Sequence, residues 1–295
     1  MRLPDGGLES MPSMDDTHHV TSFPHREPTS RSQGQILRLL SYNIQVGITT
    51  RHYRQYITNS WKHVLPYPER METLRSIGQF IAGFDIVGLQ ELDTGSLRSG
   101  FVDQAEYLAQ VAMFPHWYSR TNRRIGRFAQ HALGLLGRYR AHRIVEHRLP
   151  SAIPGRGALE VHFGSEEAPL VVVLLHLSLS RRARRQQFDY VARVIAEHRY
   201  AVVMGDLNCQ PESHEMLALL HDTDLRMAPH GEHTYPSWRP VQAFDHILMS
   251  PALEVRETKV YPIAYSDHLP VGLELLLPPE VRLDDAPAEL ECVVE

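Results

Sequence analysis

The stretch Ser266-Asp267-His268-Leu269-Pro270-Val271-Gly272-Leu273 is the most specific segment of this chain. It places an acid and an imidazole directly before an apolar run of strand length. Neighbouring side chains of an extended backbone point to opposite sides, so Asp267 and His268 can serve different partners. We therefore expect a polar site at the end of a strand.

Similar short polar clusters lie at the ends of other apolar runs upstream, and Phe244-Asp245-His246 opens one. The clusters are Ser41-Tyr42-Asn43-Ile44-Gln45, Gln90-Glu91-Leu92-Asp93, His176, Gly205-Asp206-Leu207-Asn208 and Phe244-Asp245-His246. One such cluster would mean little. Several carboxylates, amides and imidazoles at strand ends suit a metal site that cleaves phosphodiesters, because a hard cation takes oxygen ligands and an attacking water needs a base.

These clusters, in this order, resemble the endonuclease/exonuclease/phosphatase superfamily, the deoxyribonuclease-I-like metallohydrolases, including its bacterial members. The resemblance covers roughly residues 36–277. It implies an α/β fold, a four-layer αββα sandwich in which two β-sheets lie face to face with helices outside. It also implies a hydrolase that uses Mg²⁺ or Mn²⁺.

The residue pattern by itself predicts an α/β layered domain with substantial antiparallel content, because strands outnumber helices. Strand-length apolar runs are predicted at 36–42, 85–90, 132–136, 158–163, 170–176, 201–205, 244–249, 258–261 and 271–277. Apolar residues spaced by three and four predict helices between them. These stripes are Met71, Leu74, Ile77, Phe80 and Ile81, then Phe188, Val191, Val194 and Ile195, and a third with Leu217 and Leu220 after Pro211.

The 295 residues, 43% of them hydrophobic, are expected to form one domain, because no linker interrupts the apolar segments and both halves contribute to the site. We expect a disordered tail at residues 1–35, the domain at 36–277 and an acidic, solvated tail at 278–295. No stretch of signal-peptide or transmembrane length is seen in the first 35 residues.

The net charge of -5 and a pI near 6.4 argue against a protein that coats DNA, without excluding a nuclease. Only Cys209 and Cys292 are present, so no disulfide framework is predicted. A reducing compartment fits this cysteine usage. We expect a cytoplasmic monomer.

Glu91, Asp267 and Gln45 are the candidate metal residues. Glu91 ends an apolar strand, where it would be either a metal ligand or an exposed loop acid; the family match makes it the direct ligand, with Asp267 assisting. Several family nucleases have a second metal-binding Asp where this chain has Gln45. A neutral amide removes one negative charge there, which favours a single or weaker metal site.

His176, Asp206 and Asn208 are candidate catalytic residues through the same resemblance. Asp206 would orient or deprotonate the attacking water, and Asn208 would donate to the phosphorane oxygens. His176 would stabilise the transition state or protonate the leaving oxygen. Taken alone, a strand-terminal His can equally be a satisfied core residue, and G-D-x-N is a common turn.

Asp245 and His268 complete the catalytic set. The resemblance makes His268 the general base or a phosphate ligand, and Asp245 the carboxylate that fixes its tautomer and raises its basicity. His246, the neighbour of Asp245, is interpreted as structural.

Candidate substrate contacts are Asn43, Trp238 with Arg239, and Arg123 with Arg124. The Asn43 amide could bond a ligand carboxylate or a phosphate oxygen, or only cap a turn. Trp238 and Arg239 could wall a base or headgroup, or the Trp could anchor a loop. Arg120, Arg123, Arg124 and Arg127 are expected in a loop that steers a polyanion or forms a solvated face.

A run of arginines at 181–185 opens the predicted helix after His176, where positive charge opposes the helix dipole. This placement hints at a phosphate or headgroup role. The leading hypothesis is a phosphodiester hydrolase acting on nucleic acid or on a lipid-type or small phosphodiester. The alternative is a catalytically idle cleft that binds a phosphorylated partner.

Overall fold

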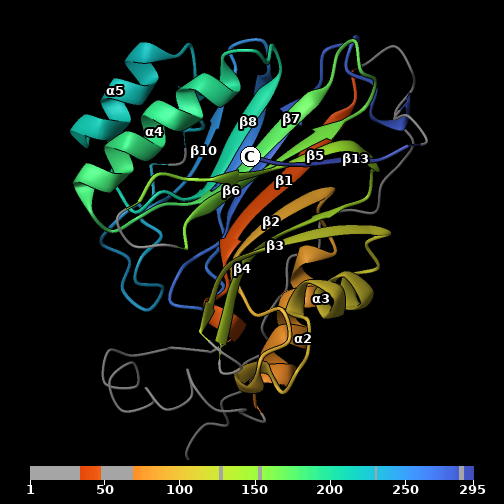
Figure 1. The fold of residues 1–295 in the computed structure, drawn as a ribbon, viewed down its shortest axis with the longest axis vertical. Coiled ribbons are helices and arrows are strands. Elements are labelled where there is room, and N and C mark those ends of the chain that lie inside the picture. Colours follow the sequence, from red (N-terminus) through yellow and green to blue (C-terminus); the bar gives the residue numbers. More distant parts are fainter. Residues whose placement is uncertain (1–33, 48–68, 126–128, 152–154, 230, 286–288) are drawn as a thin grey trace, which may run out of the picture.

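Two β-sheets face each other, and a pair of helices covers the outer face of each (Figure 1). The structure is a computed structural model that describes residues 34–47, 69–125, 129–151, 155–229, 231–285 and 289–295. The expected disordered tail falls on residues 1–35, nearly all of which lie outside the described residues.

The first sheet has six strands among the described residues, in the order β11-β12-β1-β2-β4-β3. Its central strands β1 and β2 run parallel, and β1 pairs antiparallel with β12 on its other side. The strands are β1 (Ile36–Asn43), β2 (Ile86–Leu92), β3 (His116–Ile125), β4 (Ala129–Gly137), β11 (Glu254–Val260) and β12 (Val271–Leu276).

The second sheet has seven described strands, in the order β13-β5-β6-β7-β8-β10-β9. Its central strands β7 and β8 run parallel, so their carboxyl ends meet at one edge. The strands are β5 (Ala141–Arg148), β6 (Gly157–Phe163), β7 (Leu170–His176), β8 (Ala201–Asp206), β9 (Arg226–Met227), β10 (Asp245–Met249) and β13 (Glu291–Val294).

Helices α2 (Glu69–Ile81) and α3 (Gln104–Ala112) cover the six-stranded sheet, and α4 (Arg181–Ile195) and α5 (His214–Asp222) cover the seven-stranded sheet (Figure 1). Capping residues mark where two of these helices begin. The Asp103 side chain accepts from the first backbone N–H groups of α3, and Ser213 does the same for α5. Helix α5 thus begins three residues later than Pro211 suggested.

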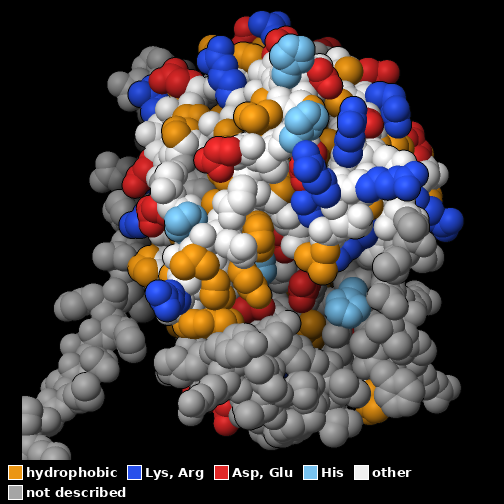
Figure 2. Space-filling model, turned by 90° about the vertical axis from the view of Figure 1, so that its left-hand side faces the viewer, with side chains coloured by type: hydrophobic (Ala, Val, Ile, Leu, Met, Phe, Trp, Pro, Cys, Tyr) orange, Lys and Arg blue, Asp and Glu red, His pale blue; other side chains and the backbone are white. Residues whose placement is uncertain are grey.

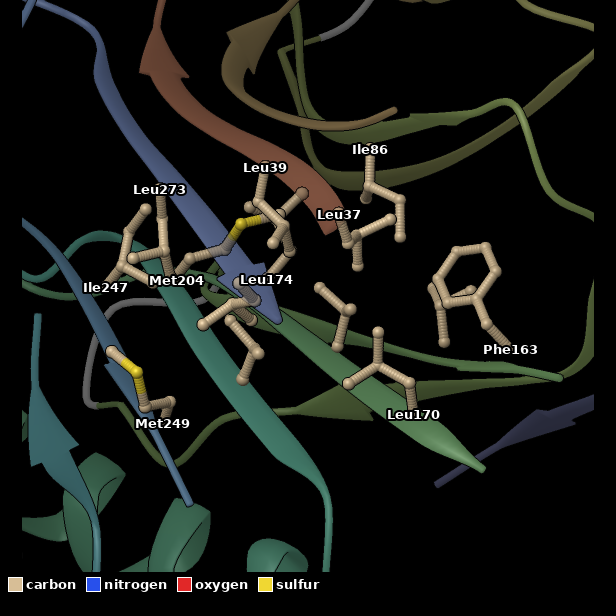
Figure 3. Packing of buried hydrophobic residues seen from close by; sticks show 14 of the residues in the cluster. Leu37, Leu39, Ile86, Phe163, Leu170, Leu174, Met204, Ile247, Met249 and Leu273 are labelled. Atoms are coloured by element: carbon tan, nitrogen blue, oxygen red, sulfur yellow. The ribbon is translucent and has the colours of Figure 1, made fainter. Parts of the chain in front are cut away.

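Three hydrophobic layers hold the four layers of secondary structure together. The middle one lies between the sheets, where Leu37 and Leu39 of β1 meet Leu174 and Met204 of β7 and β8 (Figure 3). Two further layers pack α2 with α3 and α4 with α5 onto the outer faces. The predicted αββα sandwich of the deoxyribonuclease-I type is confirmed.

Each apolar run predicted as a strand falls in a strand, but the basic tract does not lie in a loop. Arg120, Arg123 and Arg124 lie in β3, which pairs with β4 at the sheet edge, while Arg127 is outside the described residues. The prediction was wrong because β3 carries polar residues throughout most of its length, as an edge strand can.

The acidic segment after Pro278 is not wholly a solvated tail. Val281 and Leu283 are buried, and Leu283 opens a 3-10 turn, η4 (Leu283–Asp285). Beyond it, β13 pairs in parallel with β5 and extends the seven-stranded sheet. The sequence did not predict these apolar contacts, because acidic residues surround Val281 and Leu283 in this segment. None of the described helices is long and apolar enough to span a membrane.

Candidate active site

The polar clusters meet where strand ends of both sheets converge. In the six-stranded sheet Asn43, the last residue of β1, is opposite Gln90 of β2, which puts Glu91 beside it. In the seven-stranded sheet the register pairs Asp206 with His176 on one side and with Asp245 on the other. Strand register therefore brings distant parts of the chain to one place.

The amide of Asn43 bridges the two sheets. Its Nδ2 donates to Glu91 Oε1 at 3.2 Å and to Asp206 Oδ2 at 3.1 Å. Its Oδ1 accepts the backbone N–H of Gln45 at 3.1 Å. Because the backbone N–H occupies the amide oxygen, the amide nitrogen is left facing the two carboxylates.

A β-bulge turns Glu91 into the site. The pairing of β2 with β4 shifts register between Leu89 and Leu92, and Glu91 has a φ of 57°. A bulge inserts a residue and re-aims its side chain, and bulges are common beside active sites. The Glu91 side chain is 28% exposed, so this carboxylate can reach a ligand from solvent.

Gly205 allows the backbone of β8 to lie close to β7 just before Asp206. A Cβ at Gly205 would lie 2.0 Å from the Leu175 carbonyl oxygen, and its φ is 148°. Only glycine fits there. Asp206 is buried; its Oδ1 accepts the backbone N–H of Asn208 at 2.9 Å, which leaves Oδ2 for the polar cluster.

His268 is held by Asp245. The distance from His268 Nδ1 to Asp245 Oδ2 is 2.8 Å, and Thr234 Oγ1 donates to the same oxygen at 2.6 Å. The other ring nitrogen of His268, Nε2, lies 3.8 Å from Asp206 Oδ2. The ring of Tyr235 packs against His268, with centroids 4.8 Å apart.

His176 reaches the same carboxylate from β7. Its Nε2 lies 3.5 Å from Asp206 Oδ2 and 3.9 Å from Glu91 Oε1. Asp206 Oδ2 is thus surrounded by one amide and two imidazoles, from Asn43, His176 and His268. His246 instead donates from Nε2 to the Cys209 carbonyl oxygen at 2.8 Å, away from the cluster.

Burial and crowded negative charge raise the pKa values of two carboxyls. Burial, with the negative charges of Asp245 and Glu91, raises the pKa of Asp206 to about 7. Burial and the charge of Glu91 raise the pKa of Asp267 to about 6. Burial works against ionisation of Glu91 too, but the charges of His176 and His268 and the Asn43 hydrogen bond lower its pKa.

The two imidazoles have opposite electrostatic environments. Burial and the charge of Arg156 lower the pKa of His176 to about 3, so its ring is neutral at neutral pH. Burial opposes charge on His268, but Asp245 and Asp206 raise its pKa well above the ordinary value. His268 is therefore a buried imidazolium, and His176 is a neutral donor or acceptor.

The loop 234–240 is docked on the Ser266-Asp267 segment. Ser237 donates from its backbone N–H to the Asp267 carbonyl at 2.7 Å and from Oγ to the Ser266 carbonyl at 2.6 Å. Trp238, next in the loop, is half-buried, and Arg239 is exposed. The residues of this loop that touch Asp245 and His268 are Thr234 and Tyr235, whose contacts the sequence alone does not predict.

Two further predicted residues have local partners. Asn208, with a φ of 52°, donates from Nδ2 to the Leu177 carbonyl at 2.9 Å. Gln45 is buried in η1 (Gln45–Gly47), with a φ of 44°. The side chains of Arg123 and Arg124 lie outside what the structure describes, although their backbone belongs to β3.

The residues fit a hard divalent cation. Glu91, Asp206 and Asp267 provide carboxylate oxygens, the donors that Mg²⁺ and Mn²⁺ prefer. Burial is the largest cause of the raised pKa values of Asp206 and Asp267, and repulsion from the negative charge of Glu91 adds to both. A cation would relieve that repulsion, so the excess of acid is an observation in favour of a metal. Asp206, Asp245 and His268 also place ligand atoms within 4.8 Å of one another.

Comparison with known proteins now identifies the family. The family model described as "Endonuclease/Exonuclease/phosphatase family" matches residues 40–268, most of the chain. The chain belongs to the endonuclease/exonuclease/phosphatase family. Members of this family are phosphoester hydrolases that generally use a divalent metal. None of the curated proteins matches the sequence.

Solved structures of the family share the fold. An endonuclease/exonuclease/phosphatase family protein from Bacteroides thetaiotaomicron is 17% identical with a TM-score of 0.65, covering 83% of this chain and 99% of its own. A mannosyl-6-phosphatase from the same species is 17% identical (TM-score 0.61, 82% and 100% covered). Sphingomyelinase C from Streptomyces griseocarneus is 17% identical (TM-score 0.56, 81% and 99% covered).

Proposed function

We propose that this family member is a Mg²⁺- or Mn²⁺-dependent phosphodiester hydrolase that attacks with an activated water. One observation carries the proposal. A single buried carboxylate oxygen, Asp206 Oδ2, lies within 3.1–3.8 Å of an amide and two imidazoles, next to the exposed edge of Glu91. A water and a phosphate placed there would meet a base and donors together.

Glu91 and Asp267 would hold the cation, with Gln45 as a neutral neighbour. When bound, a divalent ion supplies positive charge against the phosphate oxygens. Glu91 suits this role because its pKa is lowered, so it stays ionised, and because it is partly open to solvent. The Asn43 amide fixes the orientation of Glu91 relative to Asp206.

Asp206 would take the proton from the attacking water. A pKa of about 7 makes it an efficient base near neutral pH, because a general base works best with a pKa close to the working pH. His268, charged and held by Asp245, would donate from Nε2 to a phosphate oxygen. His268 and Asp206 interact over 3.8 Å, so they titrate as a pair.

His176 and Asn208 would stabilise the negative charge that develops on the phosphorane. A neutral His176 acts here as a hydrogen-bond donor. One N–H of the Asn208 amide is engaged by Leu177, and the second is available for a phosphate oxygen.

The remainder of the substrate would extend past Asn208 toward the start of α4. A cavity of ≈ 480 Å³ is lined by Asn208, Phe244 and Arg181, and one of ≈ 750 Å³ continues it along Arg181, Arg182 and Arg185. Lys and Arg side chains gather on one side of the face that carries α4 and α5 (Figure 2). We call Arg181, Arg182, Arg184 and Arg185 the basic track. Its positive charge fits nucleic acid or a charged phospholipid headgroup.

Part of this basic track is already neutralised. The Glu215 carboxylate accepts a hydrogen bond from Arg184 Nη2 at 2.7 Å, and its other oxygen lies 3.2 Å from Arg181 Nε. Arg182 and Arg185 are therefore the arginines of the track that we expect to meet substrate. Trp238, Arg239, Arg123 and Arg124 remain proposed substrate contacts.

The alternative function is a cleft that only binds a phosphorylated partner. Loss of a catalytic side chain would be its signature, and each of the predicted catalytic residues is present. We further propose a monomer, because the site draws its residues from one chain, and a cytoplasmic location, because the exposed free thiol of Cys292 suits a reducing compartment.

The deciding experiment is a hydrolysis screen with single-stranded DNA, duplex DNA, RNA, phosphoinositides and sphingomyelin, each with Mg²⁺, with Mn²⁺ and with excess chelator. We expect turnover of one substrate class that chelator abolishes and metal restores. Glu91→Gln should weaken metal binding while leaving the thermal unfolding curve unchanged, since it removes charge and no volume. Full turnover in excess chelator would exclude the metal mechanism.

Two variants test the basic track. Arg182→Glu and Arg185→Glu should raise KM for a polyanionic or headgroup substrate and leave hydrolysis of a small aryl phosphodiester unchanged. Arg193→Glu, near the other end of α4, is the matched control.

In the substrate screen described above, hydrolysis of none of the substrates with either metal would favour the alternative function, a cleft that only binds a phosphorylated partner.

A further inference from the structure

A second group of histidines and a glutamate lies outside the active site, on the seven-stranded sheet. Glu160 and His162 belong to β6, and His198 follows the end of α4. Their ligand atoms all lie within 4.8 Å of one another. Glu160 Oε1 is 2.5 Å from His162 Nε2 and 3.3 Å from His198 Nε2.

The strand pattern explains why these side chains meet. In β6, Leu159, Val161 and Phe163 point into the core between the sheets, so Glu160 and His162 point to the opposite, helix-covered face. The cluster is distinct from the active site, because the strand pairing places Gly157 of β6, and not Glu160, at the level of His176.

We propose that Glu160, His162 and His198 form a binding site for Zn²⁺ or a similar nitrogen-preferring transition metal. Two imidazoles and one carboxylate are the ligand set of many zinc sites, with a fourth position left for water. In a tetrahedral site with bonds of about 2.0–2.1 Å, neighbouring ligand atoms lie roughly 3.3 Å apart. The distance from Glu160 Oε1 to His198 Nε2 already matches that spacing. The distance to His162 Nε2 is shorter, as in a hydrogen bond, so these two atoms would move apart by less than about 1 Å around a cation.

A carboxylate–histidine pair supports the site from behind. The second oxygen of Glu160, Oε2, lies 2.7 Å from His147 Nε2, and His147 Nδ1 lies 2.9 Å from the Tyr190 hydroxyl. Such outer partners fix the orientation of a ligand and are typical of built metal sites. Glu160, His162 and His147 are all buried, so the ligands are held rigidly.

Solvent and charge favour a cation at this place. His162 and His198 line an open cavity of ≈ 1340 Å³, in which six glutamates and three arginines also take part. The buried Nδ1 of His142 has no hydrogen-bond partner among the described residues, and its ring lies 5.8 Å from that of His162. The end of α4 adds the negative pole of a helix beside His198.

The test is zinc binding to the full chain, stripped with chelator and then kept in excess Mg²⁺ so that the oxygen-rich active site prefers the hard ion. Calorimetry should show one Zn²⁺ site, and added Zn²⁺ should raise the Tm. Co²⁺ in its place should give the visible absorption of a four-coordinate ion. His198→Ala should raise the Kd for Zn²⁺ by about 100-fold or more and abolish the Tm shift, because losing a ligand costs more than losing an outer partner.

Two controls separate this site from others. His221→Ala removes an exposed histidine of α5 and should leave zinc binding unchanged. His176→Ala removes an active-site imidazole and should also leave it unchanged. The proposal is overturned if the unmodified chain takes no zinc, or if His176→Ala abolishes binding that His198→Ala retains. Glu160→Gln provides a second test should another variant fail to fold.

Discussion

Asp245 Oδ2 lies 2.8 Å from His268 Nδ1, and the carboxylate has no exposed surface. A buried carboxylate that accepts from Nδ1 leaves Nε2 as the nitrogen that faces Asp206. Asp245 also has a Thr234 hydroxyl on the same oxygen, so its own orientation is fixed. Asp245 of β10 and His268, just before β12, are therefore held together as one hydrogen-bonded unit.

The first prediction follows from that unit. Asp245→Asn and His268→Ala should each lower kcat by on the order of 10² or more, the scale of positioned acid-base groups. The double variant should be hardly slower than either single variant, because residues that act together are strongly non-additive. Steady-state kinetics with circular dichroism as the folding control would measure this. Additive losses would mean that the residues work independently.

The second prediction concerns the Asn43 amide and the pH profile. A hydrogen bond to an ionised carboxylate lowers its pKa, so Asn43→Ala should raise the pKa of Asp206 above about 7. Because Asp206 must be ionised to act as base, the rising limb of kcat/KM should move to higher pH. At pH 6 the loss should be roughly ten- to hundredfold, as expected for a charged hydrogen bond of about 1.5–3 kcal/mol.

The control for this experiment is Gln90→Ala. Gln90 is a buried amide opposite Asn43 in the strand pairing, but it donates to Ser41 rather than to a carboxylate. It should leave the pH limb in place. An unmoved limb in Asn43→Ala would show that another group is the base.

The third prediction tests how many ions the site holds. With a neutral Gln45, titration calorimetry should show a single tight Mn²⁺ site at the carboxylates of Glu91 and Asp267. Gln45→Asp should tighten that site or add a second, because it places another anion beside the carboxylates. Two equally tight Mn²⁺ sites in the unmodified protein would contradict this reasoning.

The fourth prediction concerns Gly205, and it separates the cost of a positive φ from the cost of a steric clash between an added Cβ and the neighbouring backbone. Gly205→Ala should lower the free energy of unfolding by about 3 kcal/mol or more, because its methyl group meets the Leu175 carbonyl. Gly231→Ala is the matched control: its φ is 61°, with nothing within 4 Å of an added Cβ, and it should cost about 1–2 kcal/mol. Denaturant titrations measure both. Equal losses would refute the collision.

The fifth prediction concerns thiol reactivity. Burial raises the pKa of Cys209 to about 11, so at pH 8 the group is a protonated, unreactive thiol. Cys292 is exposed. A disulfide reagent should therefore titrate one thiol at once and the second only after denaturation, and Cys292→Ser should remove the fast phase. Two fast thiols in the native protein would contradict the burial of Cys209.

The sequence predicted the buried strands well because their signal is physical and local. Runs such as Leu170–His176 are buried on both faces, so they read as continuous apolar segments. The missed strands β3, β5 and β13 carry many charged residues, since each lies at or near a sheet edge. Helix α3 was missed because alanines form much of its buried face and give a weak hydrophobic period.

The site was predictable as a set of residue types but not as a geometry. Nothing in the sequence places the Asn43 amide between two carboxylates, because its contact with Asp206 joins residues of different sheets. In the loop 234–240 the sequence favours Trp238 and Arg239 as functional residues, whereas Thr234 and Tyr235 make the contacts with Asp245 and His268. A hydroxyl and a phenol ring show their partners only once the loop is folded against Asp245 and His268.

The pairing of β1 with β12 has a consequence for synthesis. Strand β1 is among the first described segments to leave the ribosome, yet its antiparallel partner, which begins at Val271, is among the last. Such distant pairings are slow to form and leave β1 with an open edge while the chain grows. The six-stranded sheet, and the position of His268 just before β12, can therefore form only after β12 has left the ribosome. Until then the edge of β1 that pairs with β12 stays open to wrong pairing.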